Sequence, residues 1–154
     1  MALGSTIIGT GHNITASLSH IQGLYHVAVD NVVGPFIHGV YSTVIGGDFA
    51  FANGIYATAS GDYSHAEGIN TTAAGNYSHA EGMGSKTTGL GAHTEGAGTL
   101  ASGESSHAEG YYTTASGYYS HTEGSGTLAQ GKSQHAAGKF NIAQGSQTSI
   151  ANSD

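Results

Sequence analysis

Histidine and glutamate recur together between residues 65 and 135 in the pattern His-x-Glu. Successive histidines stand fourteen residues apart, and a glutamate follows five of the six. Imidazole and carboxylate groups hydrogen-bond to each other, and both ligate transition metals. The members of this His–Glu ladder are His65, Glu67, His79, Glu81, His93, Glu95, His107, Glu109, His121, Glu123 and His135. Any chemistry here is therefore repeated from unit to unit and not confined to a single place.

Glycine marks the repeating unit that must position the ladder. It occupies fifteen successive positions at a spacing of seven from Gly47 to Gly145, and the two halves differ, so the true period is fourteen. A sevenfold coiled coil needs apolar a and d positions, and glycine is a poor helix former. Side chains in segments such as 78–81 instead alternate small and large, the period of a β-strand. We predict two short strands per coil, with the glycines ending the strands and permitting the positive φ of tight turns.

Stacked coils of this kind form a parallel β-solenoid, an all-β fold. Such a thin coil admits only small side chains inside, which we predict to be Ser64, Ala66, Thr71 and Ala73 with their equivalents in later coils. Residues 47–154 contain only ten Ile, Leu, Val or Phe, so a lone chain would bury little apolar area. Repeats need stacking partners. We therefore expect the chain to oligomerise.

Residues 1–46 are more apolar, with sixteen Ile, Leu, Val or Phe. Three similar fragments occur there, at 5–9, 19–23 and 42–46; the first two are fourteen residues apart and the third begins twenty-three later. We predict a divergent apolar base or cap at 1–46, carrying one insertion, and a regular repeat region at 47–154, with no linker between them.

Charge and composition argue against several functions. Three Lys and no Arg stand against ten acidic residues, for a net charge of -7, which disfavours nucleic acid and anionic membrane surfaces as partners. No stretch approaches the ~20 apolar residues needed to span a bilayer. Ser64 and His65 are neighbours on a predicted strand and so point to opposite faces, which prevents them from acting as a catalytic pair. We expect no enzymatic activity.

The repeat resembles that of a known family. Ser-x-Ala-x-Gly followed by x-x-Ser/Thr-x-Ala-x-Gly is similar to the head repeat of trimeric autotransporter adhesins, the YadA-like head. The Ser-His-Ala-Glu-Gly variant resembles repeats in tail fibres and appendages of phages and prophages. The resemblance covers 47–151 well and 1–46 loosely. It implies a left-handed parallel β-roll with three chains around one axis, in which the ladder replaces Val and Ile of the adhesin heads.

This resemblance implies a structural and adhesive role in a virion tail or at a cell surface. We expect a homotrimeric module of a phage or phage-derived tail fibre that attaches to a host-surface glycan or protein and joins other tail or appendage proteins. A bacterial trimeric surface adhesin head is the first alternative. A metal-binding or pH-responsive trimer built on the His–Glu ladder is the second.

The ladder itself has three interpretations. We favour a hydrogen-bonded structural array at the trimer interface, because repeats copy structural residues whereas a metal site needs only one layer. A transition metal bound along the column is the alternative, and otherwise no cofactor is expected. A third interpretation is a pH switch, since protonated histidines would charge the interface.

Aromatic residues gather at the predicted turns. The favoured interpretation is that they pack between subunits or coils as anchors. The alternative is an exposed patch that binds a sugar or a host-surface protein. The residues proposed for such binding are Tyr111, Tyr112, Tyr118, Tyr119 and Phe140.

Overall fold

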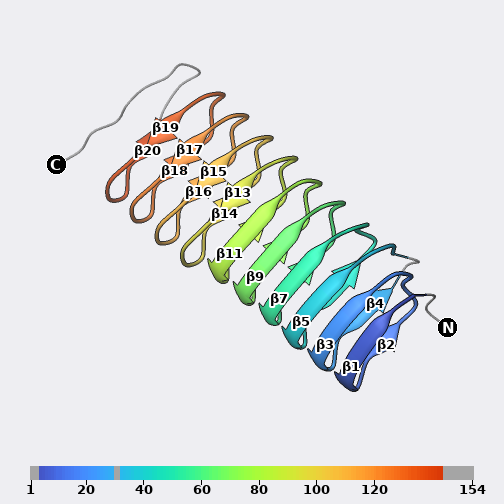
Figure 1. The fold of residues 1–154 in the computed structure, drawn as a ribbon. Coiled ribbons are helices and arrows are strands. Elements are labelled where there is room, and N and C mark those ends of the chain that lie inside the picture. The colour runs from blue at the N-terminus through green and yellow to red at the C-terminus, as the bar shows by residue number, and fades with distance from the viewer. Residues whose placement is uncertain (1–3, 30–31, 144–154) are drawn as a thin grey trace.

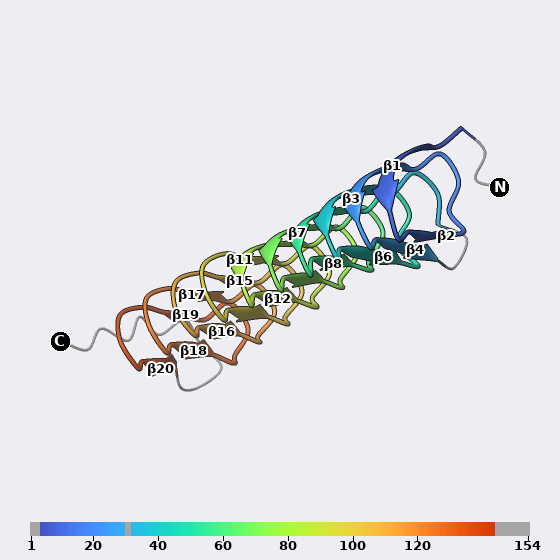
Figure 2. The same ribbon diagram turned by 90° about the horizontal axis from the view of Figure 1, so that it is seen from below.

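The computed structural model describes residues 4–29 and 32–143, which form an elongated stack of coils made of short strands and turns (Figure 1). Each coil contributes one strand to each of two ten-stranded parallel sheets. The odd-numbered strands form the first sheet and the even-numbered strands the second, so the two sheets run as two rows along the stack (Figure 2). This is the parallel β-solenoid predicted from the repeat. The described ranges contain no helix long and apolar enough to cross a membrane.

Both sheets are built from strands of two to five residues. The first sheet consists of β1 (Thr6–Thr10), β3 (His20–Leu24), β5 (Phe36–Val40), β7 (Phe51–Ile55), β9 (His65–Ile69), β11 (His79–Met83), β13 (His93–Thr94), β15 (His107–Ala108), β17 (His121–Thr122) and β19 (His135–Ala136). The second sheet consists of β2 (Asn13–Ile14), β4 (Val27–Val29), β6 (Thr43–Ile45), β8 (Thr58–Ala59), β10 (Thr72–Ala73), β12 (Lys86–Thr87), β14 (Leu100–Ala101), β16 (Thr114–Ala115), β18 (Leu128–Ala129) and β20 (Ile142–Ala143).

The register between successive coils is fourteen residues through most of the stack, as where His65 pairs with His79. Two steps are longer. His20 pairs with Phe36, sixteen residues on, and Phe36 pairs with Phe51, fifteen residues on. The prediction of a single insertion is therefore wrong: two extra residues lie between β4 and β5, and one more lies between β6 and β7.

The three similar N-terminal fragments do not occupy one column of the stack. Residues 5–9 and 19–23 overlap β1 and β3 of the first sheet, whereas 42–46 contain β6 of the second. Both strands of a coil carry related patterns of hydroxyl, apolar and glycine residues. A half-coil offset and a whole-coil repeat therefore look alike in the sequence.

Both sheets continue without a break from the apolar N-terminal coils into the regular ones, since β5 pairs with β7 over five residues. The interior changes along the way: every buried apolar residue from Ala50 onward is alanine. The larger buried apolar side chains all come from the N-terminal region: Ile21, Val32, Ile37 and Val44. The role of this region as a base or cap stays a prediction, and residues 144–154 of the predicted regular region lie outside the described residues.

The predicted interior is confirmed in the regular coils up to Ala129, but the prediction of small side chains alone is wrong at Gln134 and Asn141, which are also buried. Buried positions include Ser64, Ala66, Thr71 and Ala73. Some interior hydroxyls bond to one another: Thr99 donates to Ser85 of the preceding coil at 2.9 Å, and Thr87 lies 2.8 Å from Thr94 across the same coil. Hydrogen bonds between hydroxyls thus supplement the small apolar core.

Both glycine series lie against the backbone of the next coil, and one of them also has a positive φ. Gly68 represents the series with positive φ, at +112°, as predicted for turns. Gly75 represents the other series, which is not left-handed; there a Cβ atom would lie 2.1 Å from the carbonyl oxygen of Gly89 in the next coil. The prediction that all these glycines permit a positive φ is wrong for this second series. Its members are required because the backbones of neighbouring coils touch.

Thirteen left-handed positions among the described residues carry a residue other than glycine. Such residues have φ between 51° and 58°: Leu18, Tyr25, Tyr41, Phe49, Tyr56, Tyr63, Asn70, Tyr77, Ser105, Tyr112, Tyr119, Ser133 and Phe140. A side chain in this conformation costs about 1 kcal/mol. Stacking between coils offsets that cost, as in the Tyr25–Tyr41 and Tyr41–Tyr56 pairs with ring centroids 5.1 Å apart.

We predict that Gly75→Ala lowers the free energy of unfolding by about 2–3 kcal/mol, because its new methyl group would collide with the backbone of the next coil. The matched control is Gly84→Asn. Gly84 has φ +67° with no neighbouring atom within 4 Å, and Asn70 already adopts φ 56° one coil earlier. Its effect should stay within about 0.5 kcal/mol. Chemical denaturation measures both, and equal stabilities for the two variants would contradict the packing argument.

Candidate functional site: the outer face of the first sheet

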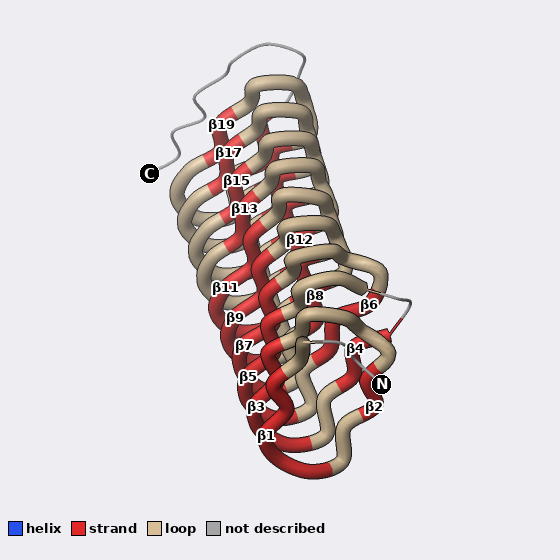
Figure 3. The backbone as a smooth tube through the Cα atoms, turned by 45° about the vertical axis from the view of Figure 1, so that its right-hand side comes forward, coloured by secondary structure: helices blue, strands red, loops and turns tan. Residues whose placement is uncertain are grey.

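The six ladder histidines form a single column on the outer face of the first sheet, where strands of successive coils lie in line (Figure 3). Their ring centroids are 4.5 to 4.8 Å apart, and each pair of rings is stacked. The column continues toward the N-terminus through Phe51, Phe36 and His20. Phe51 lies in the fourteen-residue period but is not histidine, and Phe36 and His20 lie outside the period because the steps to them are fifteen and sixteen residues. A search of the sequence that accepts any aromatic ring in place of histidine, at spacings of fourteen to sixteen residues, would have found them.

The glutamates form a second column beside the rings, because residues two apart on a strand point to the same face. At the N-terminal end of the ladder each histidine approaches the glutamate of its own coil. His65 Nε2 lies 3.2 Å from Glu67 Oε2, and His79 Nε2 lies 3.7 Å from Glu81 Oε2. Neither contact is aligned as a hydrogen bond. They are contacts at ion-pair distance that become charge pairs only when the histidine is protonated.

At the C-terminal end the pairing shifts by one coil. His121 Nε2 lies 3.2 Å from Oε1 of Glu109 in the preceding coil, and His135 Nε2 lies 3.4 Å from Oε1 of Glu123. The His121–Glu109 contact has hydrogen-bond geometry. Among the described residues of the ladder it is the only hydrogen bond between a histidine and a glutamate. The expected hydrogen-bonded array is therefore formed at one step of the ladder and is not continuous.

His93 and His107 lie between these two pairing patterns and belong to neither. The Nε2 atoms of both are buried and have no hydrogen-bond partner. A side-chain hydrogen bond between Glu95 and Glu109 lowers the pKa of Glu95, which follows β13, below its usual range. The middle of the ladder therefore contains two imidazole nitrogens without partners beside a carboxylate.

Burial keeps the central histidines neutral. It lowers the pKa of His79, His93 and His107 below the ordinary value, and the charge of neighbouring imidazoles lowers these pKa values further. Nearby glutamates act in the opposite direction but do not offset these effects. At neutral pH this part of the ladder therefore carries uncharged rings.

A separate histidine pair lies closer to the N-terminus, where sequence reasoning assigned no function. His26 is completely buried, and its ring stacks on His12 at 5.2 Å. Its Nε2 lies 2.9 Å from the carbonyl oxygen of Gln22 and its Nδ1 lies 3.3 Å from that of Ser42. Burial lowers the pKa of His26. These contacts give His26 a structural role within the stack.

An apolar ridge forms a third column on the same face. It consists of Leu24, Val40, Ile55, Ile69, Met83, Ala97 and Tyr111. Its side chains are largely uncovered, with 49% of Ile69 and 57% of Met83 exposed. An open groove of about 520 Å³ lies beside the glutamate column, lined by Asn53, Gly54, Glu67, Gly68, Glu81, Gly82 and Gly96. One face of the protein thus carries rings, carboxylates and an apolar ridge side by side.

The aromatic residues proposed for surface binding do not form one patch. All five are exposed: Tyr111, Tyr112, Tyr118, Tyr119 and Phe140. Tyr111 packs edge-on against Tyr112 at 4.5 Å, whereas the rings of Tyr118 and Tyr119 lie 6.4 Å apart. These pairs occupy the two connections on either side of β16, and Phe140 occupies the turn position of Tyr112 two coils later. The structure therefore divides the predicted patch into clusters on different turns.

Comparison with known proteins does not assign the chain to a family. No family model matches the chain, and no curated protein sequence matches it. The functional argument therefore depends on the fold and on the face of the first sheet.

We predict that acidification from pH 7.5 to pH 5 lowers the midpoint of thermal unfolding at a fixed protein concentration. Histidines of the unfolded chain titrate near pH 6.5, whereas the pKa values of His26, His79, His93 and His107 are lowered in the folded state. Below about pH 6.5 the unfolded chain therefore binds more protons, and stability falls as the pH drops toward the folded pKa values.

Differential scanning calorimetry at the two pH values measures this effect. His93→Gln removes one of the four histidines and should reduce the pH dependence of the midpoint. A midpoint that rises on acidification would show that protonation stabilises the stack, against the lowered pKa values.

Proposed function

We propose that the chain is a homotrimeric β-roll module of a phage or phage-derived tail fibre or appendage. In this proposal each chain winds left-handedly, and three parallel chains place the outer faces of their first sheets around a common axis. The trimer acts as a rigid, non-catalytic shaft in a virion tail or on a cell surface. The observation that carries the proposal is the exposed apolar ridge, which runs beside the glutamate column over most of the stack.

The small interior supports association of chains. From Ala50 onward the buried apolar residues are all alanine, so the solenoid has little apolar area to stabilise it. The large apolar side chains of these coils, such as Ile55, Ile69 and Met83, point outward instead. Covering them would supply burial that the interior lacks.

A second copy of the same chain fits this face better than an unrelated partner. Rings, carboxylates and ridge repeat at the same rise along the axis, so parallel copies present matching layers at every coil. The open groove beside the glutamates has glycines along it and offers room for the ridge of a neighbouring chain. Closed cyclic association of identical chains also leaves no unpaired interface.

The turns would remain outside such a trimer and are available for attachment. The exposed pairs Tyr111–Tyr112 and Tyr118–Tyr119 combine apolar area with hydroxyl groups, a combination suited to glycans or protein surfaces. Three copies on one shaft multiply a weak contact through avidity. The proposed partners are therefore a host-surface glycan or protein and other tail or appendage proteins.

We predict a native mass three times the chain mass of 15.4 kDa, measured by light scattering at neutral pH. Ile69→Glu should shift the mass toward the monomer, because it places a carboxylate on the ridge beside the glutamate column. Thr88→Glu is the matched control, since Thr88 is exposed but lies beyond β12 on the other sheet, and it should remain trimeric. A stable folded monomer for the unsubstituted chain would overturn the proposal.

A further inference from the structure

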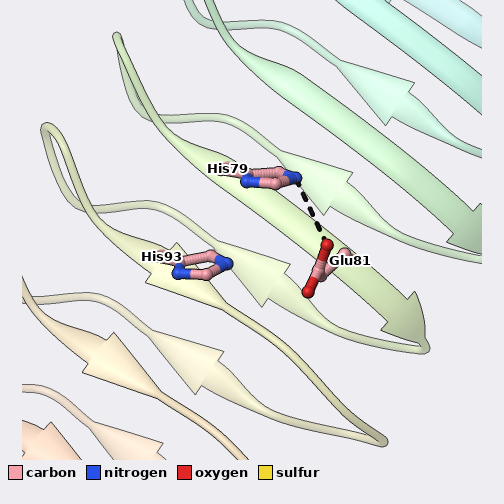
Figure 4. A group of neighbouring side chains, drawn as sticks. All are labelled: His79, Glu81 and His93. Carbon is pink, nitrogen blue, oxygen red and sulfur yellow. Dashed lines mark ion pairs between the residues drawn. The ribbon is translucent and has the colours of Figure 1, made fainter.

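Ligand atoms for a metal ion converge on the ladder in three groups. In each, two imidazole nitrogens and one carboxylate oxygen all lie within 4.8 Å of one another. The groups are His79–Glu81–His93, His93–Glu95–His107 and His121–Glu123–His135. Figure 4 shows the first: the rings of His79 and His93 lie one above the other, with the carboxylate of Glu81 beside them.

We propose that the chain binds divalent transition-metal ions of the Zn²⁺ type at two places on this face. One ion is held by His93, Glu95 and His107, and the other by His121, Glu123 and His135. Two neutral imidazoles and a carboxylate are a ligand set that suits Zn²⁺, and water completes the coordination. The oxygen-seeking ions Mg²⁺ and Ca²⁺ are not expected to compete, because two of the three ligands are nitrogen.

The surroundings of the unpartnered nitrogens favour the central position. Nε2 of His93 and Nε2 of His107 are both buried without a hydrogen-bond partner, although buried polar atoms are normally satisfied. Other ladder histidines without such a bond have a glutamate at ion-pair distance, and these two do not. An ion between them would satisfy both. The two rings are stacked with their centroids 4.7 Å apart, whereas a tetrahedral ion with metal–nitrogen bonds of about 2.1 Å holds its two ligand nitrogens about 3.4 Å apart. Both rings must therefore rotate out of the stack so that their nitrogen lone pairs point at the ion.

The glutamate column adds an electrostatic reason. Glu81, Glu95 and Glu109 project from successive coils, so their carboxyl groups stand one above another. A divalent cation beside Glu95 is attracted by the negative charge on this column. At the second position an ion would replace the contacts of His121 with Glu109 and of His135 with Glu123, so binding there should be weaker.

Sharing of His93 limits the number of ions. This residue belongs to two of the three groups, and its Nε2 atom can ligate only one ion at a time. The third group shares no residue with the others. We therefore expect two ions per chain at saturation. Every ligand comes from one chain, so this proposal is independent of whether the chains form a trimer.

The experiment is a calorimetric titration of metal-stripped protein with Zn²⁺ at pH 7.5. The unsubstituted chain should bind two equivalents, the first more tightly. His93→Gln should bind one, because it removes the ligand common to both central groups, and His121→Gln should also lose one. The matched control is His65→Gln, which removes a ladder imidazole that belongs to none of the three groups and should retain both equivalents.

Three further measurements test whether the ladder residues themselves bind the ion. Glu95→Gln preserves the ring stack and should weaken the tighter binding at least about 10-fold. With Cu²⁺ as the probe, electron paramagnetic resonance should show hyperfine coupling to nitrogen. Circular dichroism checks that each variant is folded. The absence of saturable Zn²⁺ binding, or an equal loss in His65→Gln and His93→Gln, would overturn the proposal.

Discussion

The close contact between the backbones of neighbouring coils determines the register of the stack and the columns of side chains on its surface. His65 donates its amide to the carbonyl of Ser78 at 2.8 Å, and equivalent bonds join coil to coil through the stack. At Gly75 the coils lie so near that a single methyl group would collide with the next backbone. This contact fixes the register, and a fixed register turns any repeated residue into a column. A short sequence unit thereby becomes a set of long, parallel surface features.

Stacking like residues has electrostatic consequences that an ordinary sheet avoids. Carboxylates such as Glu81, Glu95 and Glu109 stand beside one another, and neighbouring imidazoles disfavour protonation of one another. The ladder accommodates this by keeping its central histidines neutral and by changing the pairing of histidine and glutamate along its length. The change leaves a short segment around His93 with nitrogens that no protein group satisfies. In the proposed trimer, neighbouring chains cover the apolar ridge of this face. At the proposed metal sites, ions bind the nitrogens that lack partners.

The sequence predicted most of the fold because its period is strict from residue 47 onward. The two strands per coil, the buried Ser64 and Ala66 and the outward column of histidines all follow from spacing and alternation. Where the period changes, around Phe36 and Phe51, the same reasoning miscounted the insertions.

Other features depend on three-dimensional contacts that spacing does not encode. The sequence does not reveal that both glycine series touch the backbone of the next coil, or that only one of them has a positive φ. The choice of glutamate by each histidine is also not local: His121 selects Glu109, twelve residues away, over the glutamate two residues away. For the same reason the proposed patch of five aromatic residues separates onto different turns, since Tyr112 and Tyr118 lie on opposite sides of β16.

The most direct test of the central claim, that the first-sheet faces of three chains meet, is a distance measurement between spin labels. The chain contains no cysteine, so single labels can be introduced by Ser125→Cys in the ridge column or Thr88→Cys beyond the second sheet. Double electron–electron resonance should give a short, narrow distance between chains for position 125 and a longer one for position 88. A longer distance at position 125 than at position 88, or no distance between chains at either, would contradict the account.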